Sequence, residues 1–263
     1  MTLVIFTDLD GTLLDHETYS WEPASPALQQ LRDHDVPLIM ASSKTAAEIA
    51  PLRSKTGFEH CPAIVENGAG ILPAGALHDG HDAADYRVIR DALVEIPKDL
   101  RQHFRGFGDM TVQDIALTTG LPENDAAHAG QRAFSEPGVW SGDDAQRDAF
   151  CQALADLGIS ARYGGRFLTL SLGGTKAGRM RDVLELLDRK DAGTVALGDA
   201  PNDIEMLEAA DYGFIIANPH GNGIPPLKGE HDGRITRTKA AGPTGWNEAV
   251  LSVLSQRTPA PGA

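Results

Sequence analysis

The chain has 263 residues and carries 37 acidic against 23 basic side chains, so its formal net charge is -14. It can bury one large core or two modest ones, and the acidic balance argues against nucleic acid or an anionic membrane as a partner. The two cysteines, Cys61 and Cys151, have no C-x-x-C spacing and indicate no disulfide framework. Met1 leads into an apolar segment without a basic leader, and no apolar run approaches the length of a membrane span. We therefore expect a soluble cytoplasmic protein, in which local positive groups must meet any anionic substrate.

The first apolar segment, residues 3–6, predicts a buried strand that leads into Asp8 and Asp10. Side chains two apart on an extended segment point to the same side, and ligands of open α/β sheets bind at the carboxyl ends of the strands. Because close like charges repel unless a cation lies between them, the pair favours a site for Mg²⁺, which prefers oxygen ligands. An ordinary polar turn stays an alternative for this Asp-x-Asp taken alone.

The elements that follow alternate between strands and helices. This alternation predicts an α/β fold with a doubly wound, Rossmann-like parallel sheet. The predicted elements are a helix that begins near Pro23 or Pro26, a strand over 36–41, a helix through about Arg53, a strand over 62–65, a helix from Lys176, and strands over 194–197 and 212–216.

The alternation breaks between about residues 84 and 172, which predicts an inserted α+β cap domain because so long a structureless loop is improbable. We expect a core domain made of residues 1–83 and 173–256, with hinges near 83–85 and 172–174 and a disordered tail over 257–263. In the insert we predict helices near 91–104, 112–119, 122–134 and 143–157, and strands near 139–140, 159–163 and 166–171.

Three further stretches carry side chains suited to phosphoryl chemistry, which needs cations and fixed hydrogen-bond donors. Ser42 ends a predicted strand just before a helix, where its hydroxyl and the next N–H groups can bind a phosphate oxygen; a helix cap is the alternative. Lys176 opens a helix, where the helix dipole disfavours a cation unless an anion is bound nearby, although an isolated lysine there is more often solvated surface. Asp199 follows a buried strand and is better explained as a metal ligand than as a cap, whereas Asp203 could be an N-terminal cap.

Together, Asp8-x-Asp10, Ser42, Lys176 and Gly198-Asp199-x-x-Asn202-Asp203 resemble the four ordered motifs of the haloacid dehalogenase superfamily. The insert between the second and third motifs resembles the subclass in which a large α+β cap covers the site. The resemblance implies a phosphatase in which Asp8 is the nucleophile and Asp10 the general acid and base. It also implies that Ser42 and Lys176 bind phosphoryl oxygens, that Asp8, the Asp10 carbonyl and Asp199 hold Mg²⁺, and that Asn202 and Asp203 orient Lys176 or metal-bound water.

A closer resemblance is to the mannosyl-3-phosphoglycerate phosphatases. It implies a small phosphorylated sugar-glycerate as substrate and mannosylglycerate as product. Glucosyl-3-phosphoglycerate or another sugar phosphate, such as sucrose phosphate, stays an alternative substrate. The same motifs would also occur in a phosphomannomutase-like transferase, and the same fold in a non-catalytic binding protein. The stretches that carry the resemblance are 19–24, 42–49, 65–69, 164–167 and 242–246.

Substrate selectivity is expected from the insert and from residues beside the core site. Arg166 follows two glycines, Gly164 and Gly165, that let a ligand approach the backbone, and its guanidinium can bind a carboxylate with two hydrogen bonds. The alternative for Arg166 is an ordinary surface arginine at a strand edge. The alternative for Asn67-Gly68 is a simple turn without a role in binding. The further candidates for binding the substrate are Ser43, Lys44, Glu66 and Asn67.

Overall fold

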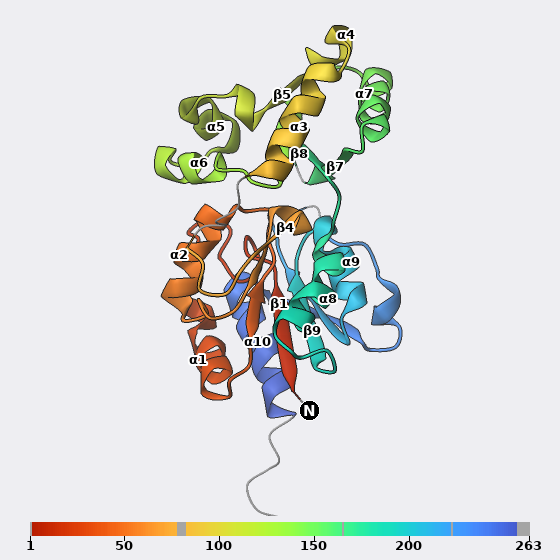
Figure 1. Cartoon of the computed structure of the whole chain (residues 1–263). Helices are drawn as coiled ribbons and strands as arrows, with labels where there is room; N and C mark the ends of the chain where they lie inside the picture. Colours follow the sequence, from red (N-terminus) through yellow and green to blue (C-terminus); the bar gives the residue numbers. More distant parts are fainter. Residues whose placement is uncertain (1, 78–82, 165, 222, 257–263) are drawn as a thin grey trace, which may run out of the picture.

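The computed structural model describes residues 2–77, 83–164, 166–221 and 223–256, which form two lobes, one above the other in Figure 1. The lower lobe, the core, contains the elements that precede α3 and those from α8 onward. The upper lobe, the cap, contains α3 to β8. The predicted tail, 257–263, lies outside the described residues.

The described part of the core has a five-stranded parallel sheet in the order β11-β10-β9-β1-β2. β1 lies between β9 and β2, so that Phe6 is opposite Ala196 on one side and Ile39 on the other. All residues of β1, β2 and β9 are buried. The strands are β1 (Leu3–Thr7), β2 (Leu38–Met40), β9 (Gly193–Gly198), β10 (Tyr212–Ala217) and β11 (Ile235–Ala241).

Helices cover both faces of this sheet. The chain steps from β1 to β2 in one direction and from β9 to β10 in the other, and right-handed crossovers then place α1 and α9 on opposite faces. α10 packs against α1, and α8 packs against α9 (Figure 1). The predicted fold class, a doubly wound parallel sheet with an inserted α+β region, is confirmed. The core helices are η1 (Glu22–Ala24), α1 (Ser25–Asp33), α2 (Ala46–Thr56), η2 (Glu66–Gly68), α8 (Lys176–Leu186), η4 (Pro201–Asp203), α9 (Ile204–Ala209), η5 (Lys228–Glu230) and α10 (Gly242–Ser255).

The strand expected over 62–65 is present, but it does not extend the parallel sheet. It forms β3 (Ala63–Val65), which pairs antiparallel with β4 (Gly70–Leu72). Among the described residues, a single parallel bridge between Ala41 and Ile64 joins β3 to the chain directly after β2. The tight turn of η2 between β3 and β4 explains their antiparallel pairing, because it reverses the chain at once, whereas parallel partners need a crossover of a dozen or more residues.

The cap contains an antiparallel sheet in the order β5-β6-β8-β7. The single helix predicted near 91–104 is wrong: the chain leaves the helix at Pro97, whose ring disfavours a helical conformation of the preceding residue, and β5 follows. The helix predicted near 122–134 stops before Gly130, which leaves room for a longer β6. The cap elements are α3 (Ala84–Glu95), α4 (Lys98–Arg101), β5 (Phe104–Gly106), η3 (Phe107–Asp109), α5 (Val112–Thr119), α6 (Glu123–Ala129), β6 (Ser135–Trp140), α7 (Asp144–Asp156), β7 (Ser160–Gly164) and β8 (Phe167–Ser171).

One segment of the cap is built into the core. Ala133 and Phe134, which precede β6, belong to the hydrophobic cluster of the core rather than to either cluster of the cap. The ring of Phe134 lies over Gly70, where a Cβ atom would be only 2.3 Å from it. The cap is therefore anchored to the core between α6 and β6 as well as through the two chain crossings.

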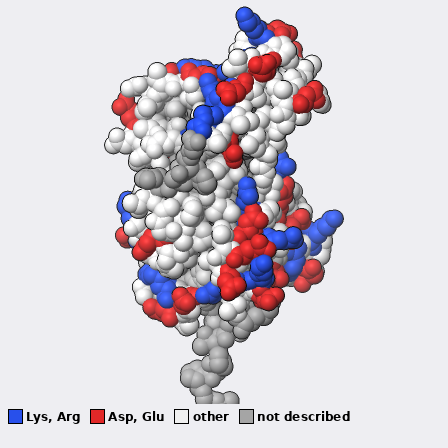
Figure 2. Space-filling model, viewed as in Figure 1, with Lys and Arg blue, Asp and Glu red and all other residues white. Residues whose placement is uncertain are grey.

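Charged side chains of both signs are mixed on the face of the molecule shown in Figure 2. None of the helices in the described ranges combines the length and the apolar character needed to cross a lipid bilayer.

Candidate active site

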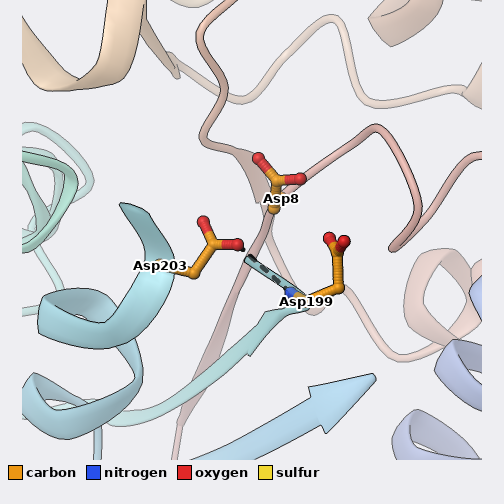
Figure 3. Close-up of side chains that lie close together, drawn as sticks. All are labelled: Asp8, Asp199 and Asp203. Atoms are coloured by element: carbon orange, nitrogen blue, oxygen red, sulfur yellow. Dashed lines mark hydrogen bonds between the residues drawn. The ribbon is translucent and has the colours of Figure 1, made fainter. Parts of the chain in front are cut away.

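Three carboxylates meet where two neighbouring strands end. Asp8 follows β1, Asp199 follows β9, and Asp203 closes the short helix η4, so parallel pairing brings them to one edge of the sheet (Figure 3). One oxygen of each lies within 4.8 Å of the others, and all three residues are buried. The N–H of Asp8 donates to the carbonyl of Leu197 at 2.9 Å, which fixes the nucleophile candidate to the end of β9.

Lys176 supplies the positive charge of this cluster from the first residue of α8. Its Nζ lies 2.5 Å from Oδ1 of Asp8 and 2.7 Å from Oδ1 of Asp203. Burial opposes the ammonium charge, but Asp203 and Asp8 outweigh it, so the pKa of Lys176 lies above its ordinary value. Burial and then repulsion from Asp203 hold the pKa of Asp8 well above its ordinary range, although Lys176 acts in the opposite direction.

Asp199 is held by two neutral donors. The hydroxyl of Thr12 donates to its Oδ1 at 2.5 Å, and the amide of Asn218 donates to its Oδ2 at 2.6 Å. Burial still raises the pKa of Asp199. Gly11, at a positive φ of 80°, must be glycine here, because a Cβ atom would lie 2.8 Å from Oδ2 of Asp199. Asp8 and Asp199 are buried carboxylates with raised pKa values, and Lys176 pairs with Asp8 and Asp203 rather than with Asp199. This donor set favours a further cation.

The oxygens of Asp203 have other partners. Its Oδ1 contacts Lys176, and its Oδ2 accepts from the N–H groups of Asp199 and Ala200, each at 3.1 Å. Asp203 thus fixes the lysine and the turn after β9. Among the described residues, no hydrogen bond joins the neighbouring Asn202 to Lys176; its amide donates to Oδ1 of Asn67 at 3.3 Å. A role of Asn202 in orienting metal-bound water stays a prediction.

Asp10 lies beside this cluster, at the edge of a cavity between the two lobes. Its Oδ2 pairs with Nζ of Lys44 at 3.0 Å, whereas its Oδ1 is buried and has no hydrogen-bond partner among the described residues. Lys44 also faces Glu48 at 3.7 Å and the ring of Tyr19 at 5.3 Å. Burial opposes the charge on Lys44, but Asp10 and then Glu48 keep its pKa above the ordinary value.

The segment of residues 42–45 joins β2 to α2, and it is named the phosphate-binding loop after the role proposed for it below. Ser42 is buried, and its Oγ accepts weakly from the N–H of Lys44 at 3.3 Å. Thr45 caps α2 in a capping box with Glu48, so the N–H of Thr45 is already used. The loop therefore opens at the positive end of a helix, which suits an anion.

The cavity has a volume of about 180 Å³ and is lined by both lobes. Arg166 reaches it from the cap, where its Nη2 donates to the carbonyl of Thr119 at 2.9 Å and its guanidinium lies 5.5 Å from the centre of the Phe167 ring. Gly164 ends β7, and Gly165 lies outside the described residues. The polar residues among those that line the cavity are Asp10, Tyr19, Ser43, Lys44, Glu48, Asn67, Thr119, Arg132, Arg166 and Thr169.

Glu66 does not line this cavity, although it was a candidate for substrate binding. Its buried carboxylate accepts from the N–H groups of Ala133 and Phe134 at 2.9 and 3.3 Å and from the hydroxyl of Ser135 at 2.7 Å. Arg132 completes this arrangement at 3.2 Å. The contacts connect Glu66 with the cap, and a role in binding substrate stays a prediction.

The structure thus brings Asp8, Lys176, Asp199 and Asp203 into one cluster, with Asp10 beside it. Sequence reasoning missed Asn218 and Arg132 and gave no role to the hydroxyl of Thr12. Asn218 follows the partly buried strand β10, much as Asp199 follows β9, so its position at a strand end was an available signal. Arg132 lies within the helix predicted near 122–134, although the observed helix ends at Ala129, and it carried no such signal.

Comparison with protein families matches the haloacid dehalogenase-like hydrolases over residues 5–135 and 140–228. Similar solved structures have the same fold at low identity. A phosphatase of the haloalkanoate enzyme superfamily from Bacteroides thetaiotaomicron is 20% identical with a TM-score of 0.65, over 96% of this chain and 95% of that one. The sucrose-phosphatase from Synechocystis sp. PCC6803, solved with sucrose and phosphate, is 16% identical with a TM-score of 0.62, over 96% and 98%. A protein from Geobacillus kaustophilus is 18% identical with a TM-score of 0.66, over 97% and 99%.

Proposed function

Because the chain belongs to the haloacid dehalogenase-like hydrolases, we propose that it is a magnesium-dependent phosphatase that converts mannosyl-3-phosphoglycerate to mannosylglycerate and inorganic phosphate. The observation that carries the phosphatase activity is the buried Lys176, which binds one oxygen of Asp8 beside Asp199. The substrate assignment rests on the closer sequence resemblance and on the polar cavity between the lobes.

Asp8 is the proposed nucleophile. Lys176 holds its Oδ1, while the hydroxyl of Thr7 donates to its backbone carbonyl at 2.7 Å and so limits rotation of the residue. Its other oxygen attacks phosphorus; a carboxylate-phosphorus bond forms as the bond from phosphorus to the leaving oxygen breaks. Ser42 and Lys176 bind phosphoryl oxygens during this step.

Asp10 is the proposed general acid and base. In its acid form it gives a proton to the leaving alkoxide, and it later takes one from the water that attacks the aspartyl-phosphate. This second step frees the Asp8 carboxylate, restores the acid form of Asp10 and releases phosphate. Its buried Oδ1, without a partner among the described residues, is available for this transfer while Lys44 holds Oδ2.

The carboxylates of Asp8 and Asp199, with the backbone carbonyl of Asp10, are the proposed ligands of Mg²⁺. Their fit is supported by burial, which raises the pKa values of Asp8 and Asp199 and so makes a bound cation favourable. Mg²⁺ supplies neutralisation of charge between the nucleophile and the phosphoryl group. Asp203 keeps Lys176 in place.

Arg166 is the proposed ligand of the glycerate carboxylate. No carboxylate of the described residues forms an ion pair with it, whereas Lys44 has Asp10 and Glu48 and Arg132 has Glu66. A guanidinium held on the cavity wall can bind a carboxylate with two hydrogen bonds. Asn67, Ser43 and Lys44 line the same cavity and are the proposed partners of sugar and glycerate oxygens.

The test is phosphate release with Mg²⁺ from mannosyl-3-phosphoglycerate, glucosyl-3-phosphoglycerate, sucrose phosphate and an aryl phosphate, compared as kcat/KM. We expect the mannosyl compound to exceed the others by orders of magnitude, and Asp8→Asn to abolish turnover. If Asp8→Asn keeps about a tenth of the wild-type rate, the assignment of Asp8 as the nucleophile is wrong. If the protein hydrolyses only the aryl phosphate, the substrate assignment is wrong, but the phosphatase activity stands.

Arg166 is tested with a matched control. Arg162 lies in β7, is exposed and pairs with Glu205 at 3.6 Å, outside the cavity lining. Arg166→Ala should raise KM for the sugar-glycerate substrate by about tenfold or more and leave the aryl phosphate unaffected, because a charged hydrogen-bonded contact is lost. Arg162→Ala should change neither value. Equal effects of Arg166→Ala on both substrates refute the carboxylate role.

A further inference from the structure

The first three carbonyl groups of the phosphate-binding loop all accept hydrogen bonds. The carbonyl of Ser42 accepts from the N–H of Asn67 at 2.8 Å, and that of Lys44 accepts from the N–H of Glu66 at 3.0 Å. Between them, the carbonyl of Ser43 accepts from Nη1 and Nη2 of Arg132, both at 3.3 Å. Two of these anchors come from the core turn η2, and the middle one comes from the cap.

These anchors determine where the N–H groups of the loop point. In a trans peptide the carbonyl and the following N–H point in opposite directions. Holding the Ser42 carbonyl therefore orients the N–H of Ser43, and holding the Ser43 carbonyl orients the N–H of Lys44. The Ser43 N–H has no acceptor among the described residues, and the Lys44 N–H donates only to Oγ of Ser42, at 3.3 Å. The loop therefore offers one free donor and one weakly held donor to an anion.

Arg132 is itself rigidly held. Its side chain is 5% exposed, its Nη2 donates to the hydroxyl of Ser135 at 2.8 Å, and it pairs with Glu66, whose side chain is 1% exposed. Glu66 adopts a left-handed backbone conformation, with φ at 52°, that a residue with a Cβ rarely takes, so the surrounding contacts must stabilise it. A second contact joins the same parts, since the hydroxyl of Thr45 donates to the carbonyl of His128 on α6 at 2.9 Å.

We propose that Arg132 of the cap is a positioning residue for the phosphate-binding loop: with Glu66 as its partner, it orients the loop donors that bind the phosphoryl group and makes their orientation depend on the docked cap. This inference rests on the proposed phosphatase function and goes beyond it, because it assigns part of the core's phosphate affinity to a cap side chain. Arg132 also lines the cavity, and its buried Nε has no partner among the described residues.

Binding of inorganic phosphate tests the proposal without knowledge of the substrate. With Mg²⁺ present, Arg132→Ala should raise the Kd of phosphate and the KM of an aryl phosphate about tenfold or more, with a smaller change in kcat, because a contact made in both ground and transition states is lost. Arg132→Lys should recover part of the affinity, since one ammonium can still reach the Ser43 carbonyl. Glu66→Gln should weaken phosphate binding less than Arg132→Ala.

Arg90 provides the matched control, because it is a cap arginine whose partners are the buried Glu136, at 2.6 Å, and Asp109, at 2.7 Å, both within the cap. Arg90→Ala should lower the Tm but leave the Kd of phosphate within about twofold of wild type. A folded Arg132→Ala protein with the wild-type Kd, an equal loss in Arg90→Ala, or a wild-type protein that binds no phosphate overturns the inference. If Arg132→Ala does not fold, Arg132→Lys and Glu66→Gln decide it by the same comparison.

The two proposals fail in different ways. A wild-type protein that binds phosphate through Arg132 but hydrolyses no phosphomonoester refutes the phosphatase and leaves the positioning role. If the wild-type protein hydrolyses sugar phosphates and Arg132→Ala has the same KM, the phosphatase function stands and the positioning role of Arg132 is refuted.

Discussion

Replacement of Lys176 by methionine should destabilise the metal-free protein strongly near neutral pH. Lys176 is 2% exposed and is the lysine paired with both Asp8 and Asp203, so its loss leaves buried carboxylates without their cation. Loss of one partner of a buried ion pair costs about 3–5 kcal/mol. For a chain of this size each kcal/mol lowers the Tm by about 2–4 °C, so a fall of roughly 6–20 °C is expected.

The pH dependence of this loss follows from the direction of the pKa shift. Burial raises the pKa of Asp8 in the folded protein, and removal of Lys176 raises it further. A carboxylate whose pKa is raised on folding contributes stability that is present at low pH and is lost as pH rises through the raised value. The penalty of Lys176→Met should therefore be smaller near pH 5 than near pH 8.

Urea unfolding in EDTA at both pH values, for wild type, Lys176→Met, Asp8→Asn and the double variant, measures this coupling. The double variant should regain most of the stability lost in Lys176→Met, because one uncompensated carboxylate has become neutral. A penalty that does not change with pH, or a double variant as unstable as the sum of the single ones, would refute this account of the cluster.

Three other predictions concern the same scaffold. Mg²⁺ at about a hundredfold excess over its Kd should stabilise the protein by about 2.7 kcal/mol. The gain should be larger near pH 8 than near pH 5, because protons compete with Mg²⁺ for the carboxylate ligands. Thermal unfolding with and without Mg²⁺ measures the gain, and an equal gain in Asp199→Asn contradicts the prediction. Gly70→Ala should lower the free energy of unfolding, measured in urea, by about 1–3 kcal/mol, because the added methyl group overpacks against the Phe134 ring. It should also raise KM for the sugar-glycerate substrate. An unchanged free energy of unfolding would mean that the Phe134 ring moves freely. Trp246→Phe removes the indole N–H that donates to the Thr7 hydroxyl at 2.9 Å and should cost about 1–3 kcal/mol in the same assay; no loss shows that the bond contributes little.

Secondary structure in the core was readable from local patterns. The buried strands β1, β2 and β9 are apolar runs, and the helix that begins at Lys176 has its apolar residues on one face. Two of the elements that were not predicted lack such a pattern: β11 is an edge strand with mostly exposed or half-buried residues, and β4 is three residues long. The helix α10 was not predicted either, although its buried Trp246, Ala249, Val250 and Val253 have helical spacing. In the cap, Pro97 divided one predicted helix in two because a local restriction outweighed the apolar spacing.

By itself, the sequence determined the parallel sheet and the positions of Asp8, Asp10, Lys176 and Asp199 at strand ends and a helix start. These features depend on the order of apolar and charged residues over a few positions, and parallel strands bring their carboxyl ends to one edge. Only the tertiary structure decided the partners of these groups, which are far apart in the chain. The amide that holds Asp199, the contacts of Glu66 with the cap and the hydrogen bonds from Arg132 to the Ser43 carbonyl depend on the docking of separate segments, and no local pattern encodes that docking.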